Sequence, residues 1–279
     1  MKKYCFYEKE HLHTLDGRPL TGTSTIGKVL NKELVYWACG LTLKELGWVN
    51  PKIKVNGVYK TVDHDERVKA MVSMFTKIRF MELNDWIALL DKAYKAHKTE
   101  SDKAKVRGVE MHKQAEHFVK AEMGKQAHLL AYSTKIQPFI DWSRVNVKRF
   151  IASEAHCYDE TLFVGGIMDY VAELNEIKLD TGVIPDGTII VGDFKSSKDS
   201  YLNQFTQAGG YALQINNNGL FSANGEHNLK LDKPIGALGI IPFGAENLNI
   251  NQHIRCNVND FIEGFRCTHY LYKLLGFTE

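Results

Sequence analysis

The sequence predicts an α/β fold with a mainly helical N-terminal region. Apolar residues recur at helical spacing through about the first 120 residues, and strand-forming residue types take over near Phe150. Beyond that point the predicted strands and helices alternate, as they do in α/β proteins. The chain has 279 residues, of which 44% are hydrophobic and 24% are charged, so it can bury a substantial core.

The N-terminal segment combines a hairpin signal with a helix signal. Residues 4–15 alternate irregularly between apolar and polar types, and the Asp16-Gly17 pair that follows favours a tight turn. Ser24 or Thr25 can cap a helix whose apolar residues share one face. We therefore expect a short hairpin followed by a helix.

Three longer helices are expected before the strands begin. Apolar spacing predicts one from Leu34 to about Gly47, a second from Asp63 to about Lys98, and a third over residues 101–123. On this basis residues 1–100 form a mainly helical cap with a short hairpin, and residues 101–279 form the core domain.

The C-terminal half supplies the predicted sheet. A helix from Ser133 through Val145 precedes it, and β-branched and aromatic residues then mark the strands. Strands are predicted over 151–158, 162–174, 188–195, 235–241 and 250–256, with helices over 199–216 and 259–275. Gly276 is a typical helix stop.

Bulk charge permits a nucleic-acid partner without indicating one. The formal net charge is +2 and the pI is near 8.1, so any phosphate-binding surface must be local. Lysines are frequent between residues 92 and 120, but acidic residues interleave with them. A solvated helix surface with i,i+4 pairs therefore competes with a DNA-tracking groove. Tyr36 and Trp37 can stack on exposed bases. Trp37 also lies at helical spacing with other apolar residues, which equally suits a place in the core.

Cysteine usage indicates a reducing compartment. The cysteines are odd in number and form no CxxC pair, which argues against a disulfide framework and against a zinc or iron–sulfur site. The first residues are charged rather than apolar, and no apolar run approaches the length of a membrane span. We therefore expect a cytoplasmic protein with no membrane partner.

Asp193 and Lys195 form an Asp-x-Lys motif at the end of an apolar strand. Side chains alternate along a strand, so these two point to one side while Phe194 points to the other. A carboxylate can hold a hard divalent cation, and an ammonium group can contact a scissile phosphate or orient the attacking water. The motif is also common as a solvated strand edge, but here the run 189–191 places it where a strand leaves the core.

Two further carboxylates can join Asp193. Asp169 follows Gly165-Gly166, where the missing side chains leave room for a polymer backbone to approach, although such a sequence is also typical of a turn or bulge. Glu154 lies on the strand before Asp169. Like-charged carboxylates are costly to assemble without a cation, so their convergence would itself indicate a metal. The sequence leaves open whether Glu154 converges.

Helical positions supply the remaining candidates. Gln207 and Tyr211 are four residues apart and share a helix face, where Gln207 can bond to phosphate or to a metal-bound water. The alternative places Tyr211 in the core with Gln207 at its margin. His112 can complete a shell of oxygen ligands, a mixture that suits Mn²⁺ as well as Mg²⁺, or it is a half-buried structural histidine.

In this order the motifs resemble those of the RecB-type branch of the PD-(D/E)XK nuclease superfamily, in particular the exonuclease-like proteins of bacteriophages. The resemblance covers roughly residues 100–275. Its motifs are Gly108 and His112, Glu154, Gly166 to Asp169, Asp193 to Ser197, and Gln207 with Tyr211. The segments 22–25 and 34–38 extend the likeness loosely to the whole chain.

The resemblance implies a restriction-endonuclease-like core, which is a mixed sheet flanked by helices, and a Mg²⁺ or Mn²⁺ cofactor. The implied metal ligands are His112, Asp169, Asp193, the Phe194 backbone carbonyl and, less firmly, Glu154. The implied catalytic residues are Lys195, Asp193, Asp169, Gln207 and Tyr211, and the candidates for substrate contact are Ser196, Ser197 and Arg107.

Two departures from the family pattern matter. Threonine often follows the lysine in the family, and Ser196 replaces it here while keeping the hydroxyl group. Some relatives carry a four-cysteine iron–sulfur cluster around the nuclease core, but Cys256 and Cys267 have no suitable partners nearby in the sequence. We therefore expect no iron–sulfur cluster.

The leading expectation is a divalent-metal-dependent DNA exonuclease or end-processing nuclease of phage or bacterial recombination, repair or replication. Its expected partners are single- or double-stranded DNA ends and, beyond these, recombination or replication proteins, in the host cytoplasm if a phage encodes it. A non-catalytic nucleic-acid-binding accessory protein and a restriction-type endonuclease are the alternatives. The intact Asp169, Asp193 and Lys195 speak against the accessory protein.

Overall fold

The chain divides into two compact units. A computed structural model describes residues 3–30, 35–55, 58–180, 182–226 and 228–276. Residues Met1–Asn31 and Arg107–Glu279 form one unit, here called the sheet unit, and Lys32–Val106 form the other, here called the inserted unit. The candidate residues at 107 and beyond therefore all belong to the sheet unit.

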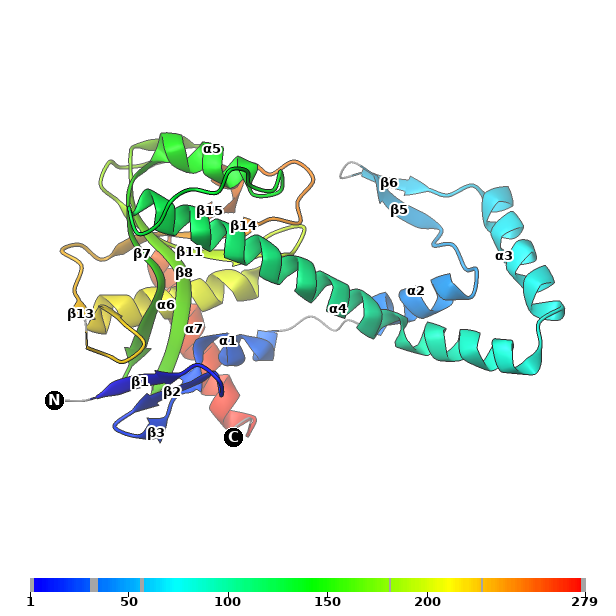
Figure 1. Ribbon diagram of the computed structural model, residues 1–279, viewed down its shortest axis with the longest axis horizontal. Helices are drawn as coiled ribbons and strands as arrows, with labels where there is room; N and C mark the ends of the chain where they lie inside the picture. The colour runs from blue at the N-terminus through cyan, green and yellow to red at the C-terminus, as the bar shows by residue number, and fades with distance from the viewer. Residues whose placement is uncertain (1–2, 31–34, 56–57, 181, 227, 277–279) are drawn as a thin grey trace. The chain divides into compact units, whose positions relative to one another are not determined.

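A mixed eight-stranded sheet is the centre of the sheet unit (Figure 1). Its four long strands are β7 (Val147–Asp159), β8 (Val164–Leu174), β11 (Ile189–Lys195) and β14 (Ile235–Pro242). β8 is antiparallel to both β7 and β11, whereas β11 and β14 are parallel. Short strands complete it: β12 (Leu220–Phe221) and β13 (Asn228–Leu229) at one edge, β15 (Ile254–Arg255) at the other, and β4 (Thr21–Gly22) beside β8.

Helices cover both faces of this sheet. Figure 1 shows α6 (Leu202–Asn218) and α7 (Val258–Leu274) on one face, with α5 (Gln137–Asn146) and the C-terminal part of α4 (Leu83–Glu122) on the other. Alternate residues of a strand point to opposite faces of the sheet and pack into two separate cores. Val191 packs toward α6 and α7, whereas Ile190 and Phe194 pack toward α4 and α5. The predicted α/β class and the mixed sheet flanked by helices are confirmed.

The N-terminal hairpin packs onto the edge of the long β7–β8 pair. Its strands are β1 (Tyr4–Tyr7), β2 (Leu12–Leu15) and β3 (Arg18–Pro19). The predicted turn at Asp16-Gly17 is confirmed, and both of these residues have positive φ. The buried Tyr4 hydroxyl lies 2.6 Å from His13 Nδ1 and 3.0 Å from Nδ1 of His156 on β7.

The helix after the hairpin does not begin where the sequence predicts. α1 (Thr23–Ile26) begins two or three residues earlier than expected, its N-cap Gly22 makes no side-chain capping bond, and a 3₁₀ turn η1 (Gly27–Leu30) follows. Thr23 instead donates to the Gly165 carbonyl of β8 at 3.0 Å. Neither Ser24 nor Thr25 caps this helix.

The inserted unit contains α2 (Val35–Glu45), the hairpin β5 (Lys52–Val55) and β6 (Val58–Thr61), α3 (His64–Arg79) and the first part of α4. The single helix predicted over 63–98 is wrong, because the chain turns at residues 80–82. The separate helix predicted over 101–123 is wrong too, since α4 runs unbroken from Leu83 to Glu122. Asp63 caps α3 by accepting from the Asp65 and Glu66 amides.

The remaining elements are close to the prediction except near residue 250. There the expected strand is a 3₁₀ turn, η2 (Ile250–His253), followed by the two-residue β15. A small hairpin of β9 (Ile177–Leu179) and β10 (Gly182–Ile184) lies between β8 and β11 in the chain. Among the described helices, none combines the length and the hydropathy needed to cross a lipid bilayer.

Candidate active site

Asp169 on β8 joins two of the predicted positions. Its carboxylate accepts a hydrogen bond from the Phe194 amide of β11, and its other oxygen lies 3.6 Å from His112 Nδ1 on α4. Burial alone would lower the pKa of His112, but the bond to Asp169 and the charges of Asp169 and Asp193 outweigh it and raise the pKa overall. Residues 57 positions apart in the sequence are thus brought into one ionic contact.

Asp193 and Lys195 form an ion pair on one side of β11, as the strand alternation predicts. Phe194 points to the opposite side and is fully buried beneath α4 and α5. Asp193 is 5% exposed, and burial raises the pKa of its carboxyl group against the opposing effect of Lys195. Burial lowers the pKa of Lys195, but the charges of Asp193 and Asp169 more than compensate, so its pKa is raised.

A chain of side-chain bonds extends from Lys195 onto α6. Lys195 Nζ donates to Gln207 Oε1 at 3.4 Å, and Gln207 Nε2 donates to the Tyr211 hydroxyl at 2.7 Å. Tyr211 is 4% exposed and belongs to the core between α6 and the sheet. Both sequence interpretations therefore hold in part, because Tyr211 is a core residue and Gln207 also contacts the Asp-x-Lys lysine.

The space beside Gly165 and Gly166 is filled by protein. A Cβ added to Gly166 would lie 2.6 Å from Tyr211 Cε1 and 2.8 Å from Thr23 Oγ1. A Cβ on Gly165 would lie 3.0 Å from Leu20. The expectation that a polymer backbone approaches here is wrong: these glycines admit Tyr211 and the N-terminal segment instead.

Gly108 has a comparable packing role on α4. A Cβ at this position would lie 3.1 Å from the Ser196 Cβ, so the helix passes very close to the end of β11. His112 is one turn further along the same helix, which places its ring edge-on to Phe194 at 5.8 Å between centroids. Gly108 thus allows α4 to pass close to β11, and His112, one turn later, places its imidazole beside Asp169.

Glu154 lies beside Asp169 in the sheet. The β7–β8 register pairs Ser153 with Tyr170 and Ala155 with Met168, which sets Glu154 opposite Asp169. Glu154 has φ of +49°, and burial, followed by the charges of Asp169 and Glu116, raises its pKa to about 8. Glu154 therefore lies next to Asp169, a position that the sequence left open.

The three candidates for substrate contact occupy different settings. Ser196 packs against Gly108, whereas Ser197 Oγ donates to the Asp199 carbonyl at 2.7 Å and accepts from Gln204 at 3.3 Å. Arg107 is exposed on α4 next to Gly108. Ser197 thereby organises the start of α6, and only Ser196 and Arg107 lie beside the turn of α4 that leads to His112.

Sequence reasoning missed several residues around this cluster. Glu116 lies one turn after His112, pairs with Lys120, and contributes to the raised pKa of Glu154. The i,i+4 spacing to His112 was a visible signal for it. No sequence signal indicated that Thr23 and Gln214 meet, because their 2.8 Å hydrogen bond joins positions 191 residues apart.

The donors present suit a divalent cation chemically, although they are not arranged around one. Within the described residues, no group of three or more His, Cys, Asp or Glu side chains has the arrangement of a metal site. Asp193 is turned to Lys195, and Asp169 to His112 and the Phe194 amide. Even so, two carboxylates and an imidazole lie together here, and burial, followed by the charges of Asp169 and Glu116, raises the pKa of Glu154.

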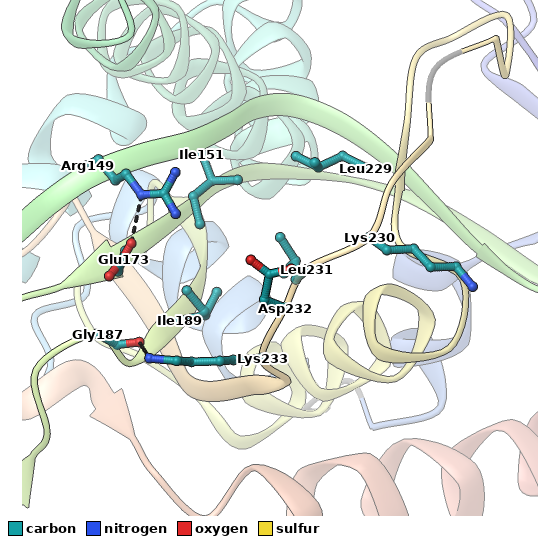
Figure 2. Close-up of a pocket in the computed structure, with 10 residues that line it drawn as sticks. All are labelled: Arg149, Ile151, Glu173, Gly187, Ile189, Leu229, Lys230, Leu231, Asp232 and Lys233. Atoms are coloured by element: carbon teal, nitrogen blue, oxygen red, sulfur yellow. Dashed lines mark hydrogen bonds and ion pairs between the residues drawn. The ribbon is translucent and has the colours of Figure 1, made fainter.

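A separate pocket of about 280 Å³ lies at the other end of the long strands (Figure 2). Ile189 lines it and begins β11, six residues before Lys195, a separation of roughly 20 Å along an extended strand. Its lining includes the Arg149–Glu173 ion pair at 2.7 Å and the Lys233 bond to the Gly187 carbonyl at 3.4 Å. This pocket is therefore distinct from the acidic cluster.

No protein-family model matches the chain, and a search of curated proteins found no similar sequence.

Proposed function

We propose that the sheet unit is a restriction-endonuclease-like core of the PD-(D/E)XK superfamily, RecB-type branch, and that the protein is a divalent-metal-dependent DNA exonuclease or end-processing nuclease. The observation that carries the proposal is the meeting of Asp169, Asp193 and Lys195 with the Gln207–Tyr211 pair. These residues come from β8, β11 and α6. Acidic groups, one lysine and a polar helix face suit the hydrolysis of a phosphodiester.

The cation in this proposal is Mg²⁺ or Mn²⁺. Asp169, Asp193, His112 and the Phe194 carbonyl would hold it, with Glu154 beside them. When bound, it would supply positive charge that stabilises the phosphorane-like transition state and acidifies water. Asp193 is paired with Lys195, and Asp169 lies 3.6 Å from His112, so the carboxylates that would hold the cation also have partners within the protein.

The protein's own residues then have distinct tasks. Lys195 can place its ammonium group against a phosphate oxygen or orient the attacking water. Gln207 limits where that ammonium can lie, because its amide oxygen accepts from Nζ while its amide nitrogen is tied to Tyr211. Tyr211 is itself held by core packing, so it anchors the chain of bonds.

Cleavage assays test this proposal directly. End-labelled single- and double-stranded DNA are incubated with the protein in Mg²⁺, in Mn²⁺ and in EDTA. The proposal expects shortening of the labelled strand with either metal and none in EDTA. Absence of cleavage of all DNA and RNA substrates in both metals would count decisively against it. Discrete fragments from closed circular DNA would instead favour the restriction-type endonuclease.

One observation favours a second candidate, the non-catalytic nucleic-acid-binding protein. The two central aspartates are satisfied by Lys195, His112 and a backbone amide without any cation, as in a purely structural ion network. Metal-independent DNA binding with unaltered substrate would support that reading.

A further inference from the structure

Helix α3 of the inserted unit has apolar side chains that its own unit leaves exposed. None of its residues is buried. Ala70, Met74 and Ile78 form a half-buried face, while a second face carries Val68, Met71, Val72 and Phe75. On this second face Met71 is 51% exposed and Phe75 is 69% exposed. A helix that is apolar on two faces is typical of one covered on both sides.

The exposed face has the spacing of a helix-pairing seam. Val68, Val72 and Phe75 are separated by four and three residues, and Met71 flanks them. The same three-and-four spacing continues to Asp65 at one end and to Arg79 at the other. We call these six residues, Asp65, Val68, Met71, Val72, Phe75 and Arg79, the α3 stripe. It is about 21 Å long at the α-helical rise.

Charge makes the α3 stripe complementary to itself in one orientation only. Asp65 is 86% exposed at the N-terminal end, and Arg79 is exposed at the C-terminal end. Two copies running antiparallel would set each Asp65 opposite an Arg79 with the apolar residues between them. Two parallel copies would set like charges together, which is unfavourable. A twofold axis produces the antiparallel arrangement and uses the same surface on both subunits.

We propose that the α3 stripe is a dimerisation surface whose occupant is the α3 stripe of a second copy of this chain, packed antiparallel about a twofold axis. Two heptads alone make a small contact. The first part of α4 carries a second row of exposed apolar residues at helical spacing in the same unit: Leu83, Ile87, Leu90 and Tyr94. The inference does not depend on the proposed nuclease activity.

Sedimentation velocity on the full chain tests the dimer. The wild type should sediment as twice 31.7 kDa at micromolar concentration. Phe75→Glu should shift it to monomer, raising the dimer dissociation constant by about tenfold or more because a charge enters the seam. Ser73→Glu is the matched control, since Ser73 is exposed on α3 outside the stripe and the dimer should persist. Circular dichroism melting shows whether each variant keeps its fold.

Charge reversal tests the orientation. Asp65→Arg alone and Arg79→Asp alone should each weaken the dimer, because like charges then face each other. An equimolar mixture of these two variants should associate again, since every facing pair in the mixed dimer is opposite in sign. A wild type that stays monomeric, or single variants that dissociate without recovery on mixing, would overturn the proposal. It would equally be overturned if stripe variants changed oligonucleotide binding and left the mass unaltered.

Discussion

Tyr211 on α6 occupies the space above Gly166 on β8, where an added Cβ would come within 2.6 Å of Tyr211 Cε1. The Tyr211 hydroxyl in turn accepts a hydrogen bond from Gln207 Nε2, and Gln207 Oε1 accepts one from Lys195 Nζ. The absence of a side chain at Gly166 thus has a consequence at the Asp-x-Lys lysine on β11, the strand that pairs with β8.

Gly166→Ala should displace the Tyr211 ring and the bonds beyond it. We expect a loss of about 1–3 kcal/mol in the free energy of unfolding, because the methyl group overpacks a rigid contact. The proposed cleavage activity should fall as well. Urea unfolding and end-labelled DNA cleavage measure the two effects. Gly264→Ala on α7 is the control, since a Cβ there meets open space and should not destabilise. Unchanged stability of the Gly166 variant would contradict the packing account.

Tyr211→Phe separates bonding from packing. The ring remains, so the free energy of unfolding should change by only about 1 kcal/mol. Loss of the hydroxyl leaves Gln207 free to rotate, and cleavage should slow by about tenfold if Gln207 positions Lys195. Rates with wild-type and variant protein at saturating Mn²⁺ measure this. A stability loss as large as that of Tyr211→Ala, with no further effect on rate, would show that the hydroxyl has a structural role only.

Divalent cation should stabilise the fold through the acidic cluster. A ligand present at 100 times its dissociation constant adds about 2.7 kcal/mol, so Mn²⁺ should raise the melting temperature in a concentration-dependent way. Asp169→Asn keeps the shape of the side chain but removes its charge, and it should abolish the shift. The exposed Asp186→Asn is the matched control and should retain the full shift. Equal Mn²⁺ shifts in all three proteins would place the cation elsewhere.

Acid should weaken the N-terminal hairpin. Burial, together with nearby imidazoles, lowers the pKa of both His13 and His156 to about 4, against an ordinary value of 6.5. The unfolded chain then binds more protons between these values. The contribution of these two histidines to the free energy of unfolding is fully present above about pH 6.5. It is lost as the pH decreases toward 4, by at most about 3 kcal/mol per imidazole. His11 and the Tyr4 hydroxyl face the same pair.

Denaturant unfolding at pH 7 and pH 5 measures this slope. His156→Asn should reduce it, whereas the same substitution at the exposed His97 on α4 should leave it unchanged. A profile that is flat over this range, or one that is equally steep in the His156 variant, would contradict the assignment to the buried imidazoles.

The parts of the fold with one regular period were predictable from sequence. Strand alternation correctly placed Asp193 and Lys195 on one side and Phe194 on the other, because β11 is regular and its apolar run is long. The turn at Asp16-Gly17 was predictable from its residue types. Both depend only on local chain geometry.

The remainder depends on contacts between distant segments. Tyr4 meets His156 across 152 residues, and Thr23 and Tyr211 together fill the space at Gly166. Periodicity carries no signal for such pairs. The turn at residues 80–82 was missed because apolar residues keep helical spacing on both sides of it. Glu154 was undecided because its place beside Asp169 depends on the β7–β8 register.

In the proposed function, Lys195, Asp169 and Asp193 hydrolyse phosphodiester bonds with a divalent cation. The most direct measurement compares single-turnover cleavage of one end-labelled DNA in Mn²⁺ by the wild type and by Lys195→Ala, both purified identically and shown to be folded. We expect the cleavage rate of the variant to be lower by about 10²- to 10⁴-fold. Equal rates in the two proteins would contradict it, since the cleavage would then arise from another site or from another protein.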